Sequence, residues 1–400
     1  MRWLAFARVG VARAAVGAVT AAVLASCSST VATSSESSSS SGSAAAPLAT
    51  SMATTDGTWA TVAMGHLDDP DNTFWQLFHR PAGATSWTDQ VQVTAVATNG
   101  GLVMASPDGT SLTVGVRPYD NLTFSPLVAT ADGGRSWSNG LLPGGLVSQP
   151  NALAVSTQGQ ALAITGTDGG RDSQSVLASS SLNNWTTLVT GDAVASSTAG
   201  QECAVGGLTA VAYAGADPVI GARCNRAGVV GLFDDSGGAW TLAGPPLPPA
   251  MAQEQVVVTS VQAAGDGLSG LLSMSGPGGA TVVVASTAHR GGSWQLSQPL
   301  AVAASERLGS VGPARNGGFF VVLSTPSGQE RAAVMEADHT SWTQLPPLPA
   351  GTATLAFGPG TTVEALAVDA STLTVWTLGG TGSWQKGQVM AVSIEYGSSS

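Results

Sequence analysis

Short apolar runs separated by turn residues recur along the chain from about residue 57 onwards. In one repeat the runs are 152–155, 161–164 and 175–178, and a fourth run begins at Trp185. Gly, Asn and Asp residues lie between these runs, and short apolar runs bordered by such residues are typical of β-strands. The pattern therefore predicts units of four strands joined by tight turns.

A tryptophan opens the fourth strand of each predicted unit. These residues are Trp87, Trp137, Trp185, Trp240, Trp294, Trp342 and Trp384. Their separations run from 42 to 55 residues. A period of this size in a strand-rich sequence is typical of propeller blades and not of helical solenoids. We therefore predict an all-β fold, a seven-bladed β-propeller of four-stranded blades over residues 56–397.

Two segments compete for the innermost strand of the first blade. This blade begins abruptly at Gly57, so its innermost strand comes either from residues 47–52 or from residues 389–396. Either segment would close the ring and remove an open sheet edge.

The first 26 residues predict a lipoprotein signal peptide. Three arginines are followed by an apolar run at 14–24, which is too short to cross a bilayer core of about 30 Å. The sequence Leu24-Ala25-Ser26-Cys27 resembles a bacterial lipobox. The resemblance implies cleavage before Cys27, a diacylglycerol on its sulfur and usually an acyl chain such as palmitate on the new amine. The alternative is an ordinary signal peptide that ends by chance at a cysteine.

Residues 27–55 predict a disordered linker behind the lipidated cysteine. They are rich in Ser, Ala and Thr and have almost no bulky apolar residue, so they cannot bury a core. Two or three acyl chains would hold such a protein at a membrane surface. We expect a protein of the bacterial cell membrane that is lipid-anchored and faces the extracytoplasmic side.

The turn before Trp137 carries the most recognisable motif in the chain. Residues 130–137 read Thr-Ala-Asp-Gly-Gly-Arg-Ser-Trp and match the Asp-box pattern at every position, and the turns before Trp240 and Trp294 match it in part. The chain thus resembles the Asp-box propellers, which include sialidases, xyloglucanase-like hydrolases, sortilin-type receptors and photosystem assembly factors. The Asp-box positions are Asp132, Gly134, Trp137, Asp235, Gly237, Trp240, Gly292 and Trp294.

The Asp-box residues are expected to be scaffold, because Asp can accept hydrogen bonds from turn amides, Gly permits positive φ and Trp fills the space between sheets. In the family the box lies on the face opposite the active site. The resemblance therefore implies a ligand face made by the second-to-third strand loops and the crossings between blades. The alternative is that these loops contain polar residues only because they are exposed to solvent. The candidates are Asp68, Asp69, Asp71, Arg117, Tyr119, Asp120, Asp168, Arg171, Asp172, Arg223, Arg226 and Arg331.

The same assignment of faces brings two cysteines to one blade. Cys203 falls in the crossing before the fourth unit, and Cys224 falls in the second-to-third loop of that unit. Because disulfides persist outside the cytoplasm, we expect a Cys203–Cys224 disulfide. The alternative is a pair of free buried thiols.

Charge narrows the range of partners. The chain has 14 Lys and Arg against 25 Asp and Glu, a net charge of −11. Without the three arginines of the predicted signal peptide the balance is 11 − 25 = −14. An acidic surface without basic patches argues against nucleic acid as a partner and against electrostatic adhesion to anionic lipid.

Candidate chemistry is sparse. Sialidase chemistry fits poorly, because no Arg-Ile-Pro motif is present, only three Tyr occur and no Glu lies near Tyr119 in the sequence. A hydrolase with two suitably spaced carboxylates stays open. The oxygen-rich segment 66–72 could hold Ca²⁺, although Asp, Asn and Pro are also ordinary turn residues. The scattered histidines and remaining cysteine predict no zinc site, and we expect no cofactor.

Two functions from different classes follow. The leading hypothesis is a membrane-anchored binding or assembly module for a cell-envelope protein or glycan. The alternative is a glycan-active hydrolase that uses carboxylates in the propeller funnel.

Overall fold

The structure is a computed structural model. It describes residues 48–66, 73–90, 100–107, 109–117, 123–167, 170–235, 237–264, 266–336, 340–358 and 362–392. The predicted signal peptide, Cys27 and nearly all of the predicted linker lie outside these residues. In the described part, no helix is long and apolar enough to cross a membrane.

Five sheets have four antiparallel strands each, in chain order. The first holds β1 (Thr50–Thr54), β2 (Gly57–Gly65), β3 (Thr73–Pro81) and β4 (Thr88–Asp89). The second holds β5 (Leu102–Ala105), β6 (Leu112–Val116), β7 (Ser125–Thr130) and β8 (Ser138–Leu142). The third holds β9 (Leu153–Val155), β10 (Ala161–Thr165), β11 (Ser175–Ser179) and β12 (Trp185–Thr190).

The last two four-stranded sheets follow the same plan. One holds β22 (Arg307–Pro313), β23 (Phe319–Ser324), β24 (Glu330–Met335) and β25 (Thr343–Gln344). The other holds β26 (Thr352–Phe357), β27 (Val363–Asp369), β28 (Thr372–Leu378) and β29 (Trp384–Ala391). Three 3₁₀ turns lie between strands, namely η2 (Arg171–Ser173), η3 (Pro249–Met251) and η4 (Arg315–Gly317).

A nine-stranded sheet contains two further four-stranded units. The first unit is β13 (Val205–Ala214), β14 (Asp217–Cys224), β15 (Leu232–Asp235) and β16 (Trp240–Leu242). The second is β17 (Gln255–Ala264), β18 (Gly267–Gly276), β19 (Gly279–Thr287) and β20 (Trp294–Leu296), with β21 (Leu300–Val302) added beside β19. A single pair, Arg223 opposite Val257, joins the two units.

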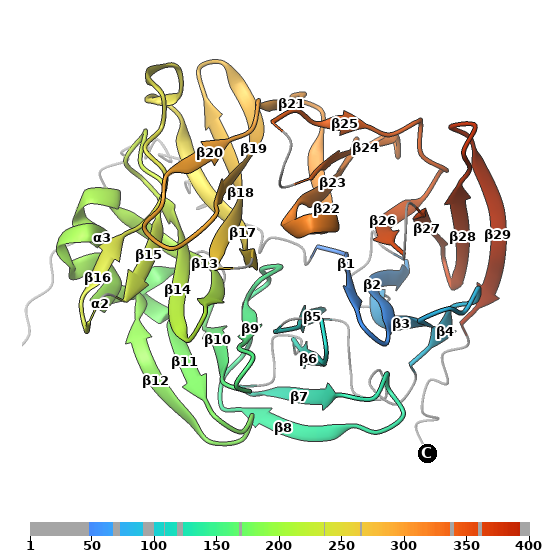
Figure 1. The fold of residues 1–400 in the computed structure, drawn as a ribbon, viewed down its shortest axis with the longest axis horizontal. Coiled ribbons are helices and arrows are strands. Elements are labelled where there is room, and N and C mark those ends of the chain that lie inside the picture. Colours follow the sequence, from blue (N-terminus) through green and yellow to red (C-terminus); the bar gives the residue numbers. More distant parts are fainter. Residues whose placement is uncertain are drawn as a thin grey trace, which may run out of the picture. The chain divides into compact units, whose positions relative to one another are not determined.

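The units follow one another around a ring, with β1, β5, β9, β13, β17 and β22 nearest its middle (Figure 1). Both faces of a sheet are buried, because each sheet packs between two neighbours. On β2, Val62 and Met64 pack against Leu366 of the last sheet, whereas Trp59 packs against Met104 of the second. This explains why the strands read as nearly continuous apolar runs.

The innermost strand of the first sheet comes from the N-terminal side. β1 pairs with β2 from Thr50 to Thr54, so one of the two expected sources is correct. Residues 389–391 instead belong to β29, the outermost strand of the last sheet. The boundary at residue 56 expected from composition therefore falls after the first strand. Residues 50–54, assigned above to the linker, are part of the sheet.

Side chains and not a shared strand join the first and last sheets. The buried Arg80 of β3 forms an ion pair of 2.5 Å with the buried Glu364 of β27, and the indole of Trp87 donates to the same carboxylate at 3.1 Å. Gln388 of β29 accepts from the Trp87 amide at 2.7 Å and donates to its carbonyl at 2.9 Å. Burial raises the pKa of Glu364, and Arg80 and Trp87 oppose this effect.

The turn at 130–137 is organised around Asp132. Its Oδ1 accepts hydrogen bonds from the Thr130 hydroxyl and the Ser136 amide, each at 2.9 Å, and its Oδ2 accepts from the Ser136 hydroxyl at 2.6 Å. Gly134 has a φ of 83°, which favours glycine. These contacts lower the pKa of Asp132 to about 2. They are all within the turn, as expected of a scaffold residue.

Other tryptophans at the fourth strands connect neighbouring units. The indole of Trp294 donates to the carbonyl of Ala243 at 3.0 Å, and that of Trp342 donates to Gln298 at 3.1 Å. Each acceptor lies in the crossing that leaves the preceding unit. The regular spacing of these tryptophans thus reflects a repeated contact between sheets.

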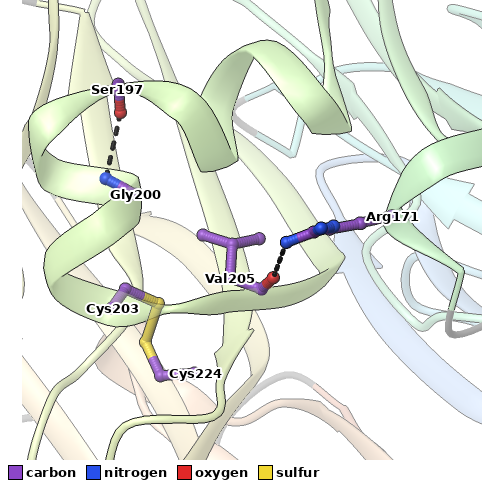
Figure 2. The surroundings of a disulfide bond; sticks show 6 residues. All are labelled: Arg171, Ser197, Gly200, Cys203, Val205 and Cys224. Atoms are coloured by element: carbon purple, nitrogen blue, oxygen red, sulfur yellow. Dashed lines mark hydrogen bonds between the residues drawn. A yellow bond between two sulfur atoms is a disulfide. The ribbon is translucent and has the colours of Figure 1, made fainter.

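The predicted disulfide between Cys203 and Cys224 is present (Figure 2). It ties the end of helix α3 (Thr198–Cys203) to the end of β14. Together with α2 (Gly191–Ser196), α3 fills the crossing between β12 and β13. The side chain of Ser197 caps α3 by accepting from the Gly200 amide at 3.0 Å. The apolar pattern did not predict these two helices.

Candidate functional site

The two ends of the sheets present different sets of loops. In an antiparallel meander, the turns after the first and third strands lie at one end, and the loop after the second strand lies at the other. We call the first end the turn face; in the second sheet it carries residues 106–111 and 131–137. We call the other end the crossing face, since the chain also crosses between sheets there.

Arg331, a candidate on the crossing face, is held by the segment that precedes β22. Its guanidinium binds Glu306 in a bidentate fashion at 2.6 and 2.7 Å and donates to the carbonyl of Ala301 at 2.7 Å. The hydrogen bond from Arg331 lowers the pKa of Glu306, and the same bond raises the pKa of Arg331. The contact fastens β24 to the crossing before β22.

Four other candidates gather around the start of β13, beside the disulfide. Arg171 donates to the carbonyl of Val205 at 3.4 Å, as Figure 2 shows, and Arg223 donates to that of Gly206 at 3.0 Å. The Arg226 amide donates to the carbonyl of Cys203 at 3.1 Å. The exposed carboxylate of Asp172 lies 3.0 Å from Arg171. These contacts hold the crossing in place.

The remaining candidates are dispersed or lie outside the described residues. Arg117, at the end of β6, donates to the carbonyl of Gly100 at 3.1 Å. It lines a recess of about 10 Å³ on the crossing side of the ring, together with Leu48 and Gln149. Asp68, Asp69, Asp71, Tyr119, Asp120 and Asp168 lie outside the described residues.

A far larger cavity, of about 520 Å³, lies in the middle of the ring towards the turn face. Six innermost strands line it, namely β1, β5, β9, β13, β17 and β22. The turns that follow four of these strands complete the wall, including residues 106–107 and 156–157. None of the crossing-face candidates lines this cavity within the described residues.

The described lining of the cavity is uncharged. It contains no Asp, Glu, Lys, Arg or His, although the chain as a whole is strongly acidic. The apolar part of the lining includes partly exposed residues such as Met52, Val155 and Pro313, whereas Met104 and Val311 are buried. Its volume lies within the range of small-molecule sites in proteins, which are typically about 300–1,000 Å³.

A few polar side chains interrupt the apolar wall. Gln262 of β17 donates from Nε2 to the carbonyls of Gly317 and Gly318, each at 2.9 Å. The hydroxyl of Ser260 hydrogen-bonds the side-chain oxygen of Asn151. Burial raises the pKa of Tyr213 to about 12, so its phenol stays neutral at physiological pH. The cavity therefore offers amide and hydroxyl groups and no described ionised group.

This lining bears on the two expected functions. A glycoside hydrolase needs two carboxyl groups about 5–10 Å apart across the scissile bond, and no described lining residue supplies one. The described residues also hold no group of three or more His, Cys, Asp or Glu that could bind a metal ion. The expected Ca²⁺ segment at 66–72 lies almost wholly outside them.

Nothing in the sequence pattern indicates that Asn151, Tyr213 and Gln262 line one cavity. They lie on or beside the first strands of three different units, so their proximity depends on ring closure. Gln262 carries the one available signal, since it is a polar residue directly after the strand-like run 256–261 and before Ala263. A polar residue in an innermost strand is a place to look for a lined cavity.

Known proteins resemble this chain in structure and not in sequence. No family model and no curated protein matches the sequence. The periplasmic gluconolactonase PpgL of Pseudomonas aeruginosa is 13% identical in sequence and has a TM-score of 0.54. The structural match covers 84% of this chain and 96% of the gluconolactonase.

Two further solved structures resemble the fold less closely. A six-bladed β-propeller lectin of Aleuria aurantia is 13% identical, covers 88% of this chain and 96% of its own, and has a TM-score of 0.45. A protein from Lactobacillus plantarum is 10% identical and has a TM-score of 0.46, and the match covers 83% of this chain and 95% of that protein. At 13% identity, the likeness to the gluconolactonase shows the fold alone. The described part of the chain is an all-β propeller built from four-stranded sheets.

Proposed function

We propose that the chain is a membrane-anchored lipoprotein whose seven-bladed propeller acts as a binding or assembly module for a cell-envelope protein or glycan. The propeller would be the extracytoplasmic part, and the lipid on Cys27 would hold it at the bacterial membrane. Seven four-stranded units support the blade number, and the Asp132 turn supports the likeness to Asp-box propellers.

One observation carries the choice of binding over hydrolysis. The large central cavity is lined, in its described part, by neutral residues alone. A general acid and a nucleophile or base would have to come from titratable side chains. The described lining can hold a ligand but supplies no group that would protonate a leaving oxygen.

A binding assay with a turnover measurement tests this choice. The full-length protein would be mixed with isolated peptidoglycan and with neutral envelope polysaccharides, and both co-sedimentation and the release of new reducing ends would be measured. The proposal expects co-sedimentation with at least one material and no release above the protein-free control. Release that disappears when a single Asp is replaced by Asn would contradict it.

The anchor has its own test. In the Cys27→Ala variant the thiol that would receive diacylglycerol is missing, so the protein should move from the membrane fraction to the soluble fraction. Labelling with radioactive palmitate should be lost at the same time. A variant that stays with the membrane would refute lipidation at Cys27 while leaving the binding assay unaffected.

A further inference from the structure

We propose that the central cavity binds an uncharged sugar that enters from the turn face, opposite the face where the sequence resemblance would place a ligand. The inference rests on the proposed binding function and deepens it, because it assigns the ligand class and the site. Its evidence is the cavity lining, which is independent of the lipid anchor.

The absence of charge in the described lining selects against ionised ligands. Moving an isolated charge out of water is costly unless a partner of opposite sign or a set of hydrogen bonds compensates for it. No described lining residue supplies an opposite charge. A neutral ligand avoids this penalty, so an uncharged sugar should bind better than its acidic or amino counterpart.

Gln262 presents a hydrogen-bond acceptor whose orientation is fixed. Both of its partners, Gly317 and Gly318, are carbonyls, so the atom facing them must be the amide nitrogen. The carbonyl oxygen Oε1 has no partner among the described residues and belongs to a lining residue. An oxygen held in this way is suited to accept a hydrogen bond from a ligand hydroxyl.

Tyr213 and Asn151 add polar groups from two other parts of the ring. The Tyr213 ring packs in the core between sheets, and its hydroxyl has no partner within the described part of the chain. Ser260 occupies only one of the two polar atoms of the Asn151 amide. The cavity lining thus includes the hydroxyl-bearing Tyr213, the carbonyl oxygen of Gln262 and the amide of Asn151. These groups can pair with the hydroxyl groups of a sugar, which both donate and accept hydrogen bonds.

The apolar wall completes the match with a sugar. Sugar rings have apolar C–H surfaces between their hydroxyl groups, and the partly exposed side chains of Met52 and Val155 can pack against these surfaces. A purely apolar ligand, such as an acyl chain, would leave Gln262, Tyr213 and Asn151 without partners after displacing water. Leaving such groups unpaired costs free energy, which argues against an acyl chain.

Isothermal titration of the full-length protein in detergent tests the proposal. The probes are cellotriose, maltotriose, mannotriose and triacetylchitotriose. Chitotriose, which carries free amines, and a galacturonic acid trimer serve as charged counterparts. The expected result is binding of at least one neutral trisaccharide and binding at least about tenfold weaker for both charged trisaccharides.

Three variants localise the binding. In Tyr213→Phe only a hydroxyl is lost, and Kd should rise about fivefold to tenfold. In Ala263→Trp an indole fills the cavity from an exposed position at the end of β17, and binding should be lost. The matched control is Ala239→Trp, which adds the same side chain at an exposed turn outside the cavity lining and should leave Kd unchanged.

The outcomes separate this inference from the proposed function. Binding of a neutral sugar that survives Ala263→Trp would overturn the cavity as the site, although the module would still bind glycan. Binding confined to a charged probe, or to envelope material without any response to the neutral probes, would overturn the ligand class. Circular dichroism and the thermal midpoint of each variant show that it is folded, so loss of binding in Ala263→Trp cannot be assigned to unfolding.

Discussion

Asp132 shows how a recognisable residue can be structural. Its carboxylate accepts three hydrogen bonds from Thr130 and Ser136, both in its own turn. Each of these bonds favours the ionised form, and together they lower its pKa to about 2. The motif that identifies the turn is therefore explained by the turn itself, without a ligand.

The lowered pKa predicts an acid-dependent loss of stability. An ordinary Asp has a pKa near 3.8, so between that value and about 2 the unfolded chain binds a proton that the folded turn does not. The stabilisation is present above pH 3.8 and is lost as the pH falls through this interval. In Asp132→Asn the thermal midpoint should be lower at pH 7 and should depend less on pH between 4 and 2.

Thermal melts of the wild type and Asp132→Asn at half-unit pH steps measure this effect. Asp172→Asn is a suitable control, because that carboxylate is exposed and its ion pair among the described residues is with the exposed Arg171. Parallel pH profiles for the wild type and Asp132→Asn would contradict the role given to this carboxylate.

The ring is built from sheets, and buried polar side chains connect the first sheet to the last. Arg80 and Glu364 have side chains only 7% and 6% exposed, and Trp87 and Gln388 add three hydrogen bonds across the same junction. Removing one partner of a buried pair leaves an uncompensated charge, which typically costs about 3–5 kcal/mol.

Arg80→Ala should therefore lower the free energy of unfolding by about 3–5 kcal/mol, as measured by urea denaturation. Arg331→Ala breaks the more exposed pair with Glu306 (Arg331 36% exposed) and should cost about 1 kcal/mol or less. Equal and small losses in the two variants would show that the junction does not depend on its buried ion pair.

Much of the element order could be predicted because its signals are local. Turn glycines and the spacing of residues such as Trp294 and Trp342 mark units that the structure confirms as four-stranded. β1 was harder, because Thr50–Thr54 has little apolar character. It is held from outside: Ser51 donates to the carbonyl of Leu355 at 2.5 Å, and Ser310 donates to that of Ala49 at 2.7 Å. Contacts about 260–300 residues away in sequence leave no local pattern.

Arg290 illustrates a contact that the pattern could not reveal. It occupies a turn that lacks the aspartate of the motif, and it binds Asp217 and Asp234 of the preceding unit, the latter at 2.9 Å. In the turn that contains Asp132, the hydrogen bonds of the carboxylate stay within the turn. In the turn that contains Arg290, the arginine instead connects two neighbouring units. Sequence comparison of the turns shows the missing Asp but not the partner that replaces its role.

At the scale of the whole molecule, the large cavity lies on the side of the ring that the sequence did not indicate. The resemblance pointed to crossing-face loops, and the described arginines there hold backbone carbonyls or Glu306. The neutral cavity lies towards the turn face. Its side chains come from six strands that are distant in sequence, so only the closed ring brings them together.

Amide hydrogen exchange with and without a saturating neutral trisaccharide tests the central claim most directly. A ligand in the cavity should slow exchange in the first-to-second turns that line it, at the amides of residues 106, 156–157, 314 and 317. Exchange in the crossing-face loops at 170–174 and 225–231 should be unchanged. Protection confined to those crossing-face loops would contradict a binding site in the central cavity.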